Sequence, residues 1–217
     1  MTLVRCDDIF FDSDAAQFEK ICHIIRRFGF DHLIGITPLG EGKGLWSNAK
    51  RLWGLPILYR TRLFNYFLLR LTGETPIGNN KQLLSLLRME FAKYSAIPAL
   101  HGLHHYRYDQ LDKEKVRSEL SNGKSLLREL FNVDVKVFVP PFNAWNHNTE
   151  QICNELDLSI DKCRAGFDLM IMKMKPDDQI VQLAKEQSSM PEVYYHPYRL
   201  ASLRKFELYL ETRRKYC

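Results

Sequence analysis

Three histidines lie within five positions in the stretch "ALHGLHHYRY", residues 99–108. His101 comes three residues before His104 and four before His105, and either spacing can turn two imidazoles towards one point. Imidazole is the commonest metal ligand among side chains and suits zinc and similar divalent ions. The stretch therefore indicates a metal site, if further ligands from elsewhere in the chain join it.

Two adjacent acids and a late histidine could complete this site. Asp7 and Asp8 follow the short run "LVRC", and His196 follows "EVYY". Zinc hydrolases commonly use three ligands of the histidine and carboxylate type and leave one position open for water. A second carboxylate can accept the proton of the attacking water, and an imidazole can protonate the leaving group. This combination predicts a metal-dependent hydrolase.

The segment "VPPFN", residues 139–143, could supply the hydrogen-bond donor that such a reaction needs. A developing oxyanion is stabilised by a positioned donor. Pro140 and Pro141 have no backbone N–H, so that of Phe142 is the first one after the apolar run that precedes them. Two consecutive prolines also stiffen the loop that would aim this donor.

The elements that must position these residues alternate between strand and helix. Apolar runs predict strands at 3–6, 32–37, 97–100, 135–139, 158–163 and 192–196. Helices are expected from Ser13 or Asp14 to Gly29 and at 81–94, 112–130, 149–156, 176–186 and 201–215. This order favours a parallel sheet or barrel, in which sites form where strands end. The residues at the end of a predicted strand or just after it are Asp7, Asp8, His101, Phe142 and His196.

Four motifs resemble, in order and approximate spacing, those of the polysaccharide deacetylases of the chitooligosaccharide deacetylase type. "RCDDI" is similar to the family's T-F-D-D-G motif and "HGLHH" to its H-[S/T]-x-x-H motif. "VPPFN" is similar to its R-P-P-[YF]-G loop and "YYHPY" to its late leucine-x-histidine strand. The resemblance spans residues 5–198 and looks closest to divergent members with H-G-x-x-H. It implies a distorted (β/α) barrel of about seven strands.

The resemblance also implies a role for each matched residue. Asp7 would be the base and His196 the acid, and the backbone N–H of Phe142 would stabilise the oxyanion. The ligands of one divalent metal ion, zinc or otherwise cobalt, nickel or manganese, would be Asp8, His101 and His105. The residues that border the substrate would be Pro141, Asn143 and Trp145.

Three positions depart from the family pattern. Val139 stands where the family usually has the arginine that holds the catalytic aspartate, which puts the tuning of Asp7 in doubt. Gly102 replaces the hydroxyl residue of the histidine motif. The acidic residue that usually orients the acid histidine is not securely found, and Asp157 and Asp161 are its candidates.

Each feature also has an ordinary structural explanation. Asp7 and Asp8 could cap a turn, His196 could be a satisfied core histidine, and a proline pair often only ends a strand. His104 is expected not to be a ligand. The coincidence of four motifs in order favours the metal site over these separate explanations.

The composition suits one domain over residues 1–217. With 45% hydrophobic and 26% charged residues the chain is of globular type. It has no apolar run long enough for a membrane span and no signal-peptide pattern at its start. The five cysteines are scattered and never spaced C-x-x-C, which favours a reducing cytoplasm. The expected localisation is the cytoplasm or, if the basic segment described below contacts lipid, the inner face of the membrane.

The positive charge is concentrated in an inserted segment, residues 41–79. Residues 41–71 hold six lysines and arginines against one acid, Glu41, which matches the formal net charge of +5 of the whole chain. Residues 45–71 add six aromatic residues. This part could be a plain cap over the site, or it could recognise an anionic or lipid-linked glycan or rest on a membrane surface. No motif supports nucleic-acid binding.

Two functions follow from these observations. The leading one is a metal-dependent hydrolase that removes N-acetyl or O-acetyl groups from a sugar or glycan, acting on non-peptide amide bonds in the first case. The alternative is a catalytically weak carbohydrate-binding protein that retains the deacetylase fold. Val139 favours the alternative, whereas Asp7 and His196 favour the enzyme because binding alone requires neither.

Overall fold

The structure is a computed structural model that describes residues 3–41, 74–162, 176–200 and 202–217. Most of the inserted segment, including residues 45–71, lies outside the described residues. Within the described part no helix is long and apolar enough to cross a membrane. The four described cysteines, at positions 6, 22, 153 and 217, are free thiols.

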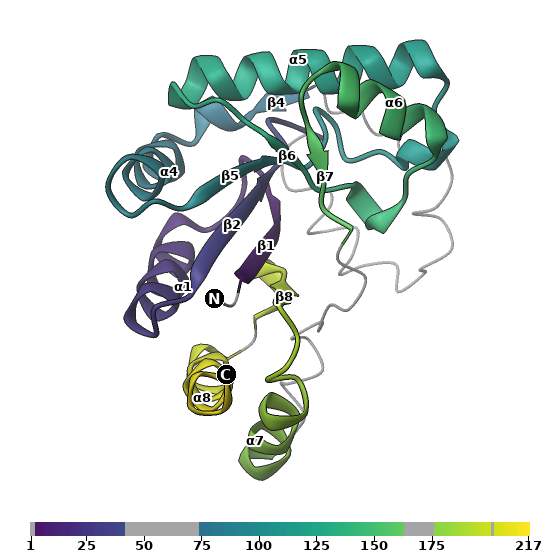
Figure 1. Cartoon of the computed structure of the whole chain (residues 1–217). Coiled ribbons are helices and arrows are strands. Elements are labelled where there is room, and N and C mark those ends of the chain that lie inside the picture. Colours follow the sequence, from purple (N-terminus) through teal and green to yellow (C-terminus); the bar gives the residue numbers. More distant parts are fainter. Residues whose placement is uncertain (1–2, 42–73, 163–175, 201) are drawn as a thin grey trace, which may run out of the picture.

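Six parallel strands form one curled sheet in the order β7-β6-β5-β2-β1-β8. The strands are β1 (Leu3–Ile9), β2 (Asp31–Ile36), β5 (Ile97–Leu100), β6 (Val137–Phe138), β7 (Ser159–Ile160) and β8 (Glu192–Tyr195). In the described part of the chain β7 and β8 are the two edges, so the barrel is open between them (Figure 1). The predicted α/β barrel is confirmed as a half-barrel, with six strands among the described residues where about seven were expected.

Helices cover the outer side of this sheet, as Figure 1 shows for α1, α4, α5 and α6. The helices are α1 (Ala15–Arg27), α4 (Lys81–Lys93), α5 (Lys113–Phe131), α6 (His147–Glu155), α7 (Asp177–Glu186) and α8 (Leu203–Tyr216). They start and end within a few residues of the predicted bounds. A short antiparallel pair that the sequence did not suggest, β3 (Leu39–Glu41) and β4 (Glu74–Pro76), flanks residues 42–73.

The helix ends follow from local side-chain chemistry. The Asp14 side chain accepts a hydrogen bond from the Gln17 amide and so caps α1, and Gly29 follows the helix with a φ of 71°. Gly123 lies inside α5, and the helix is continuous through it. Glycine is needed there for packing, since a Cβ on Gly123 would lie 2.7 Å from Leu100 Cδ1. Glycine therefore lets α5 lie close against β5.

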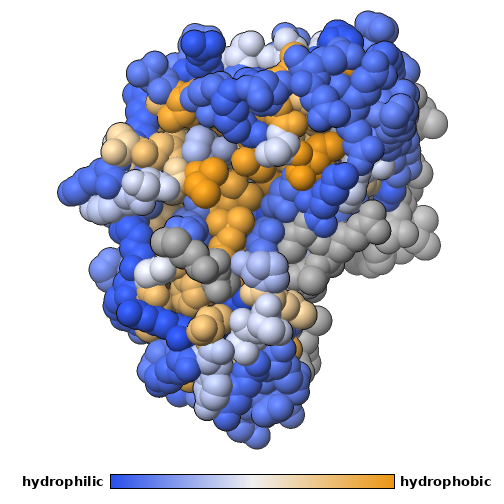
Figure 2. Space-filling view, viewed as in Figure 1, coloured by the Kyte–Doolittle hydropathy of each residue, from blue (hydrophilic) through white to orange (hydrophobic). Residues whose placement is uncertain are grey.

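The core lies mainly between the sheet and the helices, and a smaller cluster lies inside the barrel. Alternate residues of β1 and β2, such as Val4, Cys6 and Ile34, belong to the main core. The inner cluster consists of Leu33, Ala99 and Val139, with Leu3 and Val137 packed against it. In Figure 2, which has the view of Figure 1, hydrophobic residues gather over the strands within a mostly hydrophilic surround.

Two strand predictions need correction where they bear on the site. Asp7 and Asp8 were expected after the first strand, but β1 continues through both of them to Ile9. The fourth strand was expected over 135–139 and is restricted to Val137–Phe138. Val139 still donates its N–H to the carbonyl of Leu100, so the chain stays beside β5 up to the two prolines.

Candidate metal and catalytic site

Asp8, His101 and His105 come together at the carboxyl ends of β1 and β5. Oδ1 of Asp8 lies 3.0 Å from Nε2 of His101 and 2.9 Å from Nε2 of His105. One ligand atom from each residue lies within 4.8 Å of the others, as a shared metal ion requires. Oxygen and two imidazole nitrogens form a donor set that suits zinc and related transition metals.

A bulge in β1 turns both aspartates towards this site. Successive side chains of a regular strand point to opposite faces, so Asp7 and Asp8 could not both face one point in it. The pairing with β2 shifts register between Cys6 and Ile9, and Asp8 has a φ of 62°. A bulge of this kind re-aims side chains, and such backbone strain is often stored at functional sites. Both carboxylates are buried as a result.

The orientation of His101 is fixed by backbone on the neighbouring strand. Its Nδ1–H donates to the carbonyl oxygen of Val139 at 2.8 Å, and its amide donates to Ile36 of β2. Because Nδ1 is used in this way, Nε2 faces Asp8. Metal-binding histidines commonly have their second nitrogen held in this manner.

Gly102 allows the chain to turn sharply between the two histidines. Its φ is 80°, and a Cβ there would lie 2.4 Å from the carbonyl oxygen of His104. The turn therefore has no room for the hydroxyl residue that usually stands at this point of the histidine motif. The turn brings His105 back to Asp8. There the centroid of the His105 ring lies 4.5 Å from that of Phe142 and 5.7 Å from that of Phe10.

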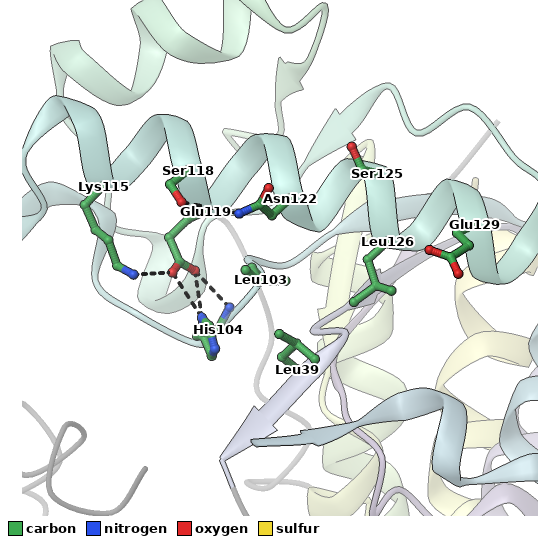
Figure 3. A pocket seen from close by; sticks show the side chains of 10 residues that line it. All are labelled: Leu39, Leu103, His104, Lys115, Ser118, Glu119, Asn122, Ser125, Leu126 and Glu129. Carbon is green, nitrogen blue, oxygen red and sulfur yellow. Dashed lines mark hydrogen bonds and ion pairs between the residues drawn. The ribbon is translucent and has the colours of Figure 1, made fainter. Parts of the chain in front are cut away.

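His104 faces a different partner, on α5. Its Nδ1 lies 3.0 Å from Oε1 of Glu119, and its amide donates to Oε2 of the same residue at 3.1 Å. Lys115 pairs with Glu119 from one turn earlier, as Figure 3 shows. These residues line a pocket of about 500 Å³ whose lining does not include Asp8, His101 or His105.

Charge pairing opposes burial at the metal-site residues. Burial alone would raise the pKa of Asp8, but the charge of His105 and hydrogen bonds with both histidines lower it well below its usual value. Burial would lower the pKa of His101, yet the hydrogen bond and the charge of Asp8 raise it. The Asp8 carboxylate is therefore held in its ionised form, which is the form that binds a metal.

Asp7 lies beside Asp8 but pairs with an arginine of its own strand. Nη2 of Arg5 donates to Oδ2 of Asp7 at 2.9 Å, and Nε lies 2.8 Å from Oδ1. The sequence predicted no partner for Asp7 because Val139 occupies the usual arginine position. The signal that could have revealed Arg5 is its spacing, since residues two apart on a strand share a face.

The late histidine faces Asp8 from β8. Nε2 of His196 lies 3.6 Å from Oδ2 of Asp8. The hydroxyl of Tyr198 donates to the same oxygen at 2.8 Å. Sequence reasoning missed Tyr198, although its position two residues after His196 was the available signal. Its ring is 45% exposed, so it lies at the rim of the site.

The loop after β6 has the backbone form that would present an amide. Phe142 and Asn143 have φ values of 59° and 49°. The turn is closed by the amides of Asn143 and Ala144, which donate to Pro140 and Pro141. Within the described residues this turn leaves the Phe142 N–H unused, and the Phe142 ring contacts His105.

The residues predicted to border the substrate have mixed positions. Pro141 is buried, and Asn143 accepts a hydrogen bond from Arg5 Nη2 at 3.3 Å. Trp145 donates from Nε1 to Glu150 of α6 at 3.2 Å. Of the two acids considered for orienting His196, Asp157 is exposed and pairs with Lys136, whereas Asp161 accepts from Arg5 at 3.1 Å.

Part of the chain is similar in sequence to a known protein family. Residues 79–160 match the family model described as polysaccharide deacetylase. The predicted resemblance to polysaccharide deacetylases is confirmed. No curated protein matches the chain by sequence.

Solved structures with this fold resemble the whole described barrel. A chitin deacetylase from Colletotrichum lindemuthianum has a TM-score of 0.64. Its identity is 10%, and the match covers 99% of this chain and 81% of that one. A family 4 carbohydrate esterase from Streptomyces lividans, in complex with acetate, has a TM-score of 0.59 with 15% identity over 98% and 86%.

A third neighbour is a CE4 family pseudoenzyme from Bacillus anthracis. Its TM-score is 0.60, with 13% identity over 99% of this chain and 60% of that one. The chain thus spans about three fifths of the length of this pseudoenzyme. At these identities the neighbours establish the fold alone.

Proposed function

We propose that the protein is a metal-dependent deacetylase of N- or O-acetylated carbohydrates. The observation that carries this proposal is the placement of Asp8, His101 and His105 around one point, with Asp7 and His196 beside it. A buried carboxylate, two imidazoles, a second carboxylate and a third imidazole supply ligands, a base and an acid. The match of residues 79–160 to the polysaccharide deacetylases supports a carbohydrate substrate.

The donor set fits a divalent transition metal. Asp8 is ionised, and Nε2 of His101 is directed by the bond from its other nitrogen to Val139. Nitrogen and oxygen ligands of this type suit zinc, and they also bind cobalt, nickel or manganese. The chemistry that such an ion supplies is Lewis acidity towards the acyl oxygen and the attacking water.

The remaining steps belong to the side chains and backbone of the chain itself. Asp7, whose two oxygens face Arg5, accepts the proton of the attacking water on a remaining lone pair. The Phe142 N–H donates to the oxygen on which negative charge develops. His196 donates a proton to the departing amine or alcohol.

A catalytically weak carbohydrate-binding protein is the second candidate. It is favoured by Val139, whose side chain lies in the apolar inner cluster and cannot hold Asp7. A pseudoenzyme is also among the proteins that share the fold. The two candidates differ in one respect, because only the enzyme requires the Arg5–Asp7 pair and His196 in addition to a binding surface.

The test combines metal analysis with turnover. The purified protein is loaded with zinc, assayed for acetate release on N-acetylated and O-acetylated glycans, and titrated with the same glycans for binding. A deacetylase gives about one ion per chain and acetate release that a chelator abolishes. Glycan binding by the zinc-loaded protein without any acetate release would establish the second candidate instead.

The basic and aromatic segment 45–71 supports a finer proposal about the substrate. We propose that it recognises an anionic or lipid-linked glycan or contacts a membrane surface from the cytoplasmic side, because cations and aromatic residues together favour charged interfaces. Sedimentation with anionic and neutral vesicles at low and high salt tests the membrane case. Charge reversal at Arg60 and Arg62 should weaken binding, and equal sedimentation with neutral vesicles would contradict it.

A further inference from the structure

Arg5 is a fully buried arginine inside the barrel, with 0% exposure. Its guanidinium touches both oxygens of Asp7, and Nη1 lies 3.1 Å from Asp161 and 3.7 Å from Glu192. The ring of Tyr194 lies 5.0 Å from its central carbon. A buried charge is costly unless it is paired, so this arginine and its carboxylates depend on one another.

The nearby carboxylates stabilise the charged form of Arg5. Burial, the largest influence, would lower its pKa, but Asp7, Asp161 and Glu192 more than compensate and raise it. A planar guanidinium that meets a carboxylate at two points also fixes the plane of that carboxylate. Arg5 therefore pairs with the Asp7 carboxylate and orients it.

The Arg5–Asp7 pair supplies Asp7 with a guanidinium partner although residue 139 is not an arginine. Val139 packs with Leu33 and Ala99 in the inner cluster. Arg5 lies on β1, two residues before Asp7 and on the same inner face, and Asn143 of the loop after β6 accepts a hydrogen bond from it at 3.3 Å. The guanidinium thus reaches Asp7 from the first strand and also contacts the loop that the family arginine would occupy.

We propose that Arg5 is the positioning residue of Asp7, aiming its carboxylate at the water and replacing from β1 an arginine that the loop after β6 lacks. The proposal rests on the proposed function, because it assigns Asp7 a task as a base. It predicts that Arg5 acts through Asp7 and not through the metal ligands. Arg5 itself is fully buried and is not one of the three candidate metal ligands.

The test uses the zinc-loaded protein and Arg5→Lys, which keeps the charge and loses the two-point contact. We expect wild-type zinc content, a KM within about threefold of the wild-type value and a kcat lower by about 10–100-fold, which is at or below the lower end of the range of about 10²–10⁴-fold for complete loss of a base. Glu192→Gln is the matched control, because it removes a different partner of the same guanidinium. It should keep kcat within about threefold.

A binding measurement separates this proposal from the proposed function. Acetohydroxamate brings an N–O–H proton that Asp7 can accept at the metal, whereas acetate brings none. Calorimetric titration should show acetohydroxamate affinity reduced about tenfold in Arg5→Lys and acetate affinity unchanged. If the wild type releases no acetate from any glycan, the proposed function fails, and this comparison still reports on Arg5.

The effect must also vanish when Asp7 is absent. In the Asp7→Asn background, adding Arg5→Lys should change acetohydroxamate affinity less than twofold. If Arg5→Lys does not fold, Arg5→Gln combined with Glu192→Gln, which removes one buried charge of each sign, takes its place in all measurements. Unchanged kcat and hydroxamate affinity, or an equal loss of zinc and acetate binding, would overturn the proposal.

Discussion

Nδ1 of His101 and the carbonyl oxygen of Val139 form a 2.8 Å hydrogen bond that joins the ends of β5 and β6. The bond sets which nitrogen of His101 faces Asp8, and it makes the residue before the proline pair a part of the candidate metal site. The acceptor is a backbone oxygen, so a change of the Val139 side chain need not break the hydrogen bond. Nδ1 of His101 is thus held by the backbone and not by another titratable side chain.

The first prediction follows from this orientation. His101→Ala should reduce bound zinc from about one ion per chain to a small fraction, because it removes a ligand that is already aimed at Asp8. His104→Asn should retain most of the zinc, because His104 faces Glu119. Zinc is measured by plasma mass spectrometry after dialysis against a weak chelator.

Folding is checked in both histidine variants by circular dichroism, since the pairing of His104 with Glu119 is buried. Full zinc content in the double variant His101→Ala, His105→Ala would contradict the assignment of these ligands. Loss of zinc from His104→Asn with folding intact would mean that the wrong pair of histidines has been chosen.

The second prediction concerns the base. Asp7→Asn should keep the zinc and lower kcat by about 10²–10⁴-fold, because the amide cannot accept the proton of the attacking water. Asp161→Asn changes the other aspartate that Arg5 contacts and should have a much smaller effect. Acetate release under saturating substrate measures kcat, and an Asp7→Asn variant with wild-type turnover would remove Asp7 from the mechanism.

Sequence reasoning placed most of this site because the strands are parallel. Parallel strands bring their carboxyl ends to one edge, so polar residues that follow several strands must meet there. Asp8, His101 and His196, which are far apart in the chain, meet as this rule predicts. The rule gives the edge of the sheet but not the direction of each side chain.

The contacts that were missed depend on such directions. The bulge that orients Asp8 contains no glycine that would have indicated it in the sequence, since Asp8 itself adopts the positive φ. In the sequence, Arg5 is simply a charged residue in a short strand. Its side chain is buried only because the sheet curls around it. Tyr198 belongs to a turn after β8 whose path the sequence did not indicate.

The third prediction compares two glycines that both have positive φ. Gly29→Ala meets nothing within 4 Å and should destabilise the fold only by the backbone strain, about 1–2 kcal/mol. Gly102→Ala meets the His104 carbonyl at 2.4 Å, so it should destabilise by more than about 2 kcal/mol and displace His105. Urea unfolding gives both values, and zinc affinity should fall only in Gly102→Ala.

The outcome that would contradict this explanation is a specific one. If Gly102→Ala matches Gly29→Ala in stability and retains wild-type zinc affinity, the turn has room for a side chain. The replacement of the motif's hydroxyl residue by glycine would then need another cause than the close approach of the chain.

The last prediction concerns His32, a buried histidine of β2 whose Nε2 lies 3.0 Å from the Tyr195 hydroxyl. Burial, helped by the charge of Arg26, lowers its pKa from 6.5 to about 3. The unfolded chain therefore binds a proton at His32 that the folded chain does not bind. Stability from this histidine is fully present above about pH 6.5 and falls by up to about 1.4 kcal/mol per pH unit below it.

His32→Gln removes this titration, so the free energy of unfolding should fall less steeply between pH 6.5 and 5 than in the wild type. His23→Gln, on the exposed side of α1, is the control and should follow the wild type. Parallel curves for the wild type and His32→Gln in metal-free protein would show that His32 is not held neutral.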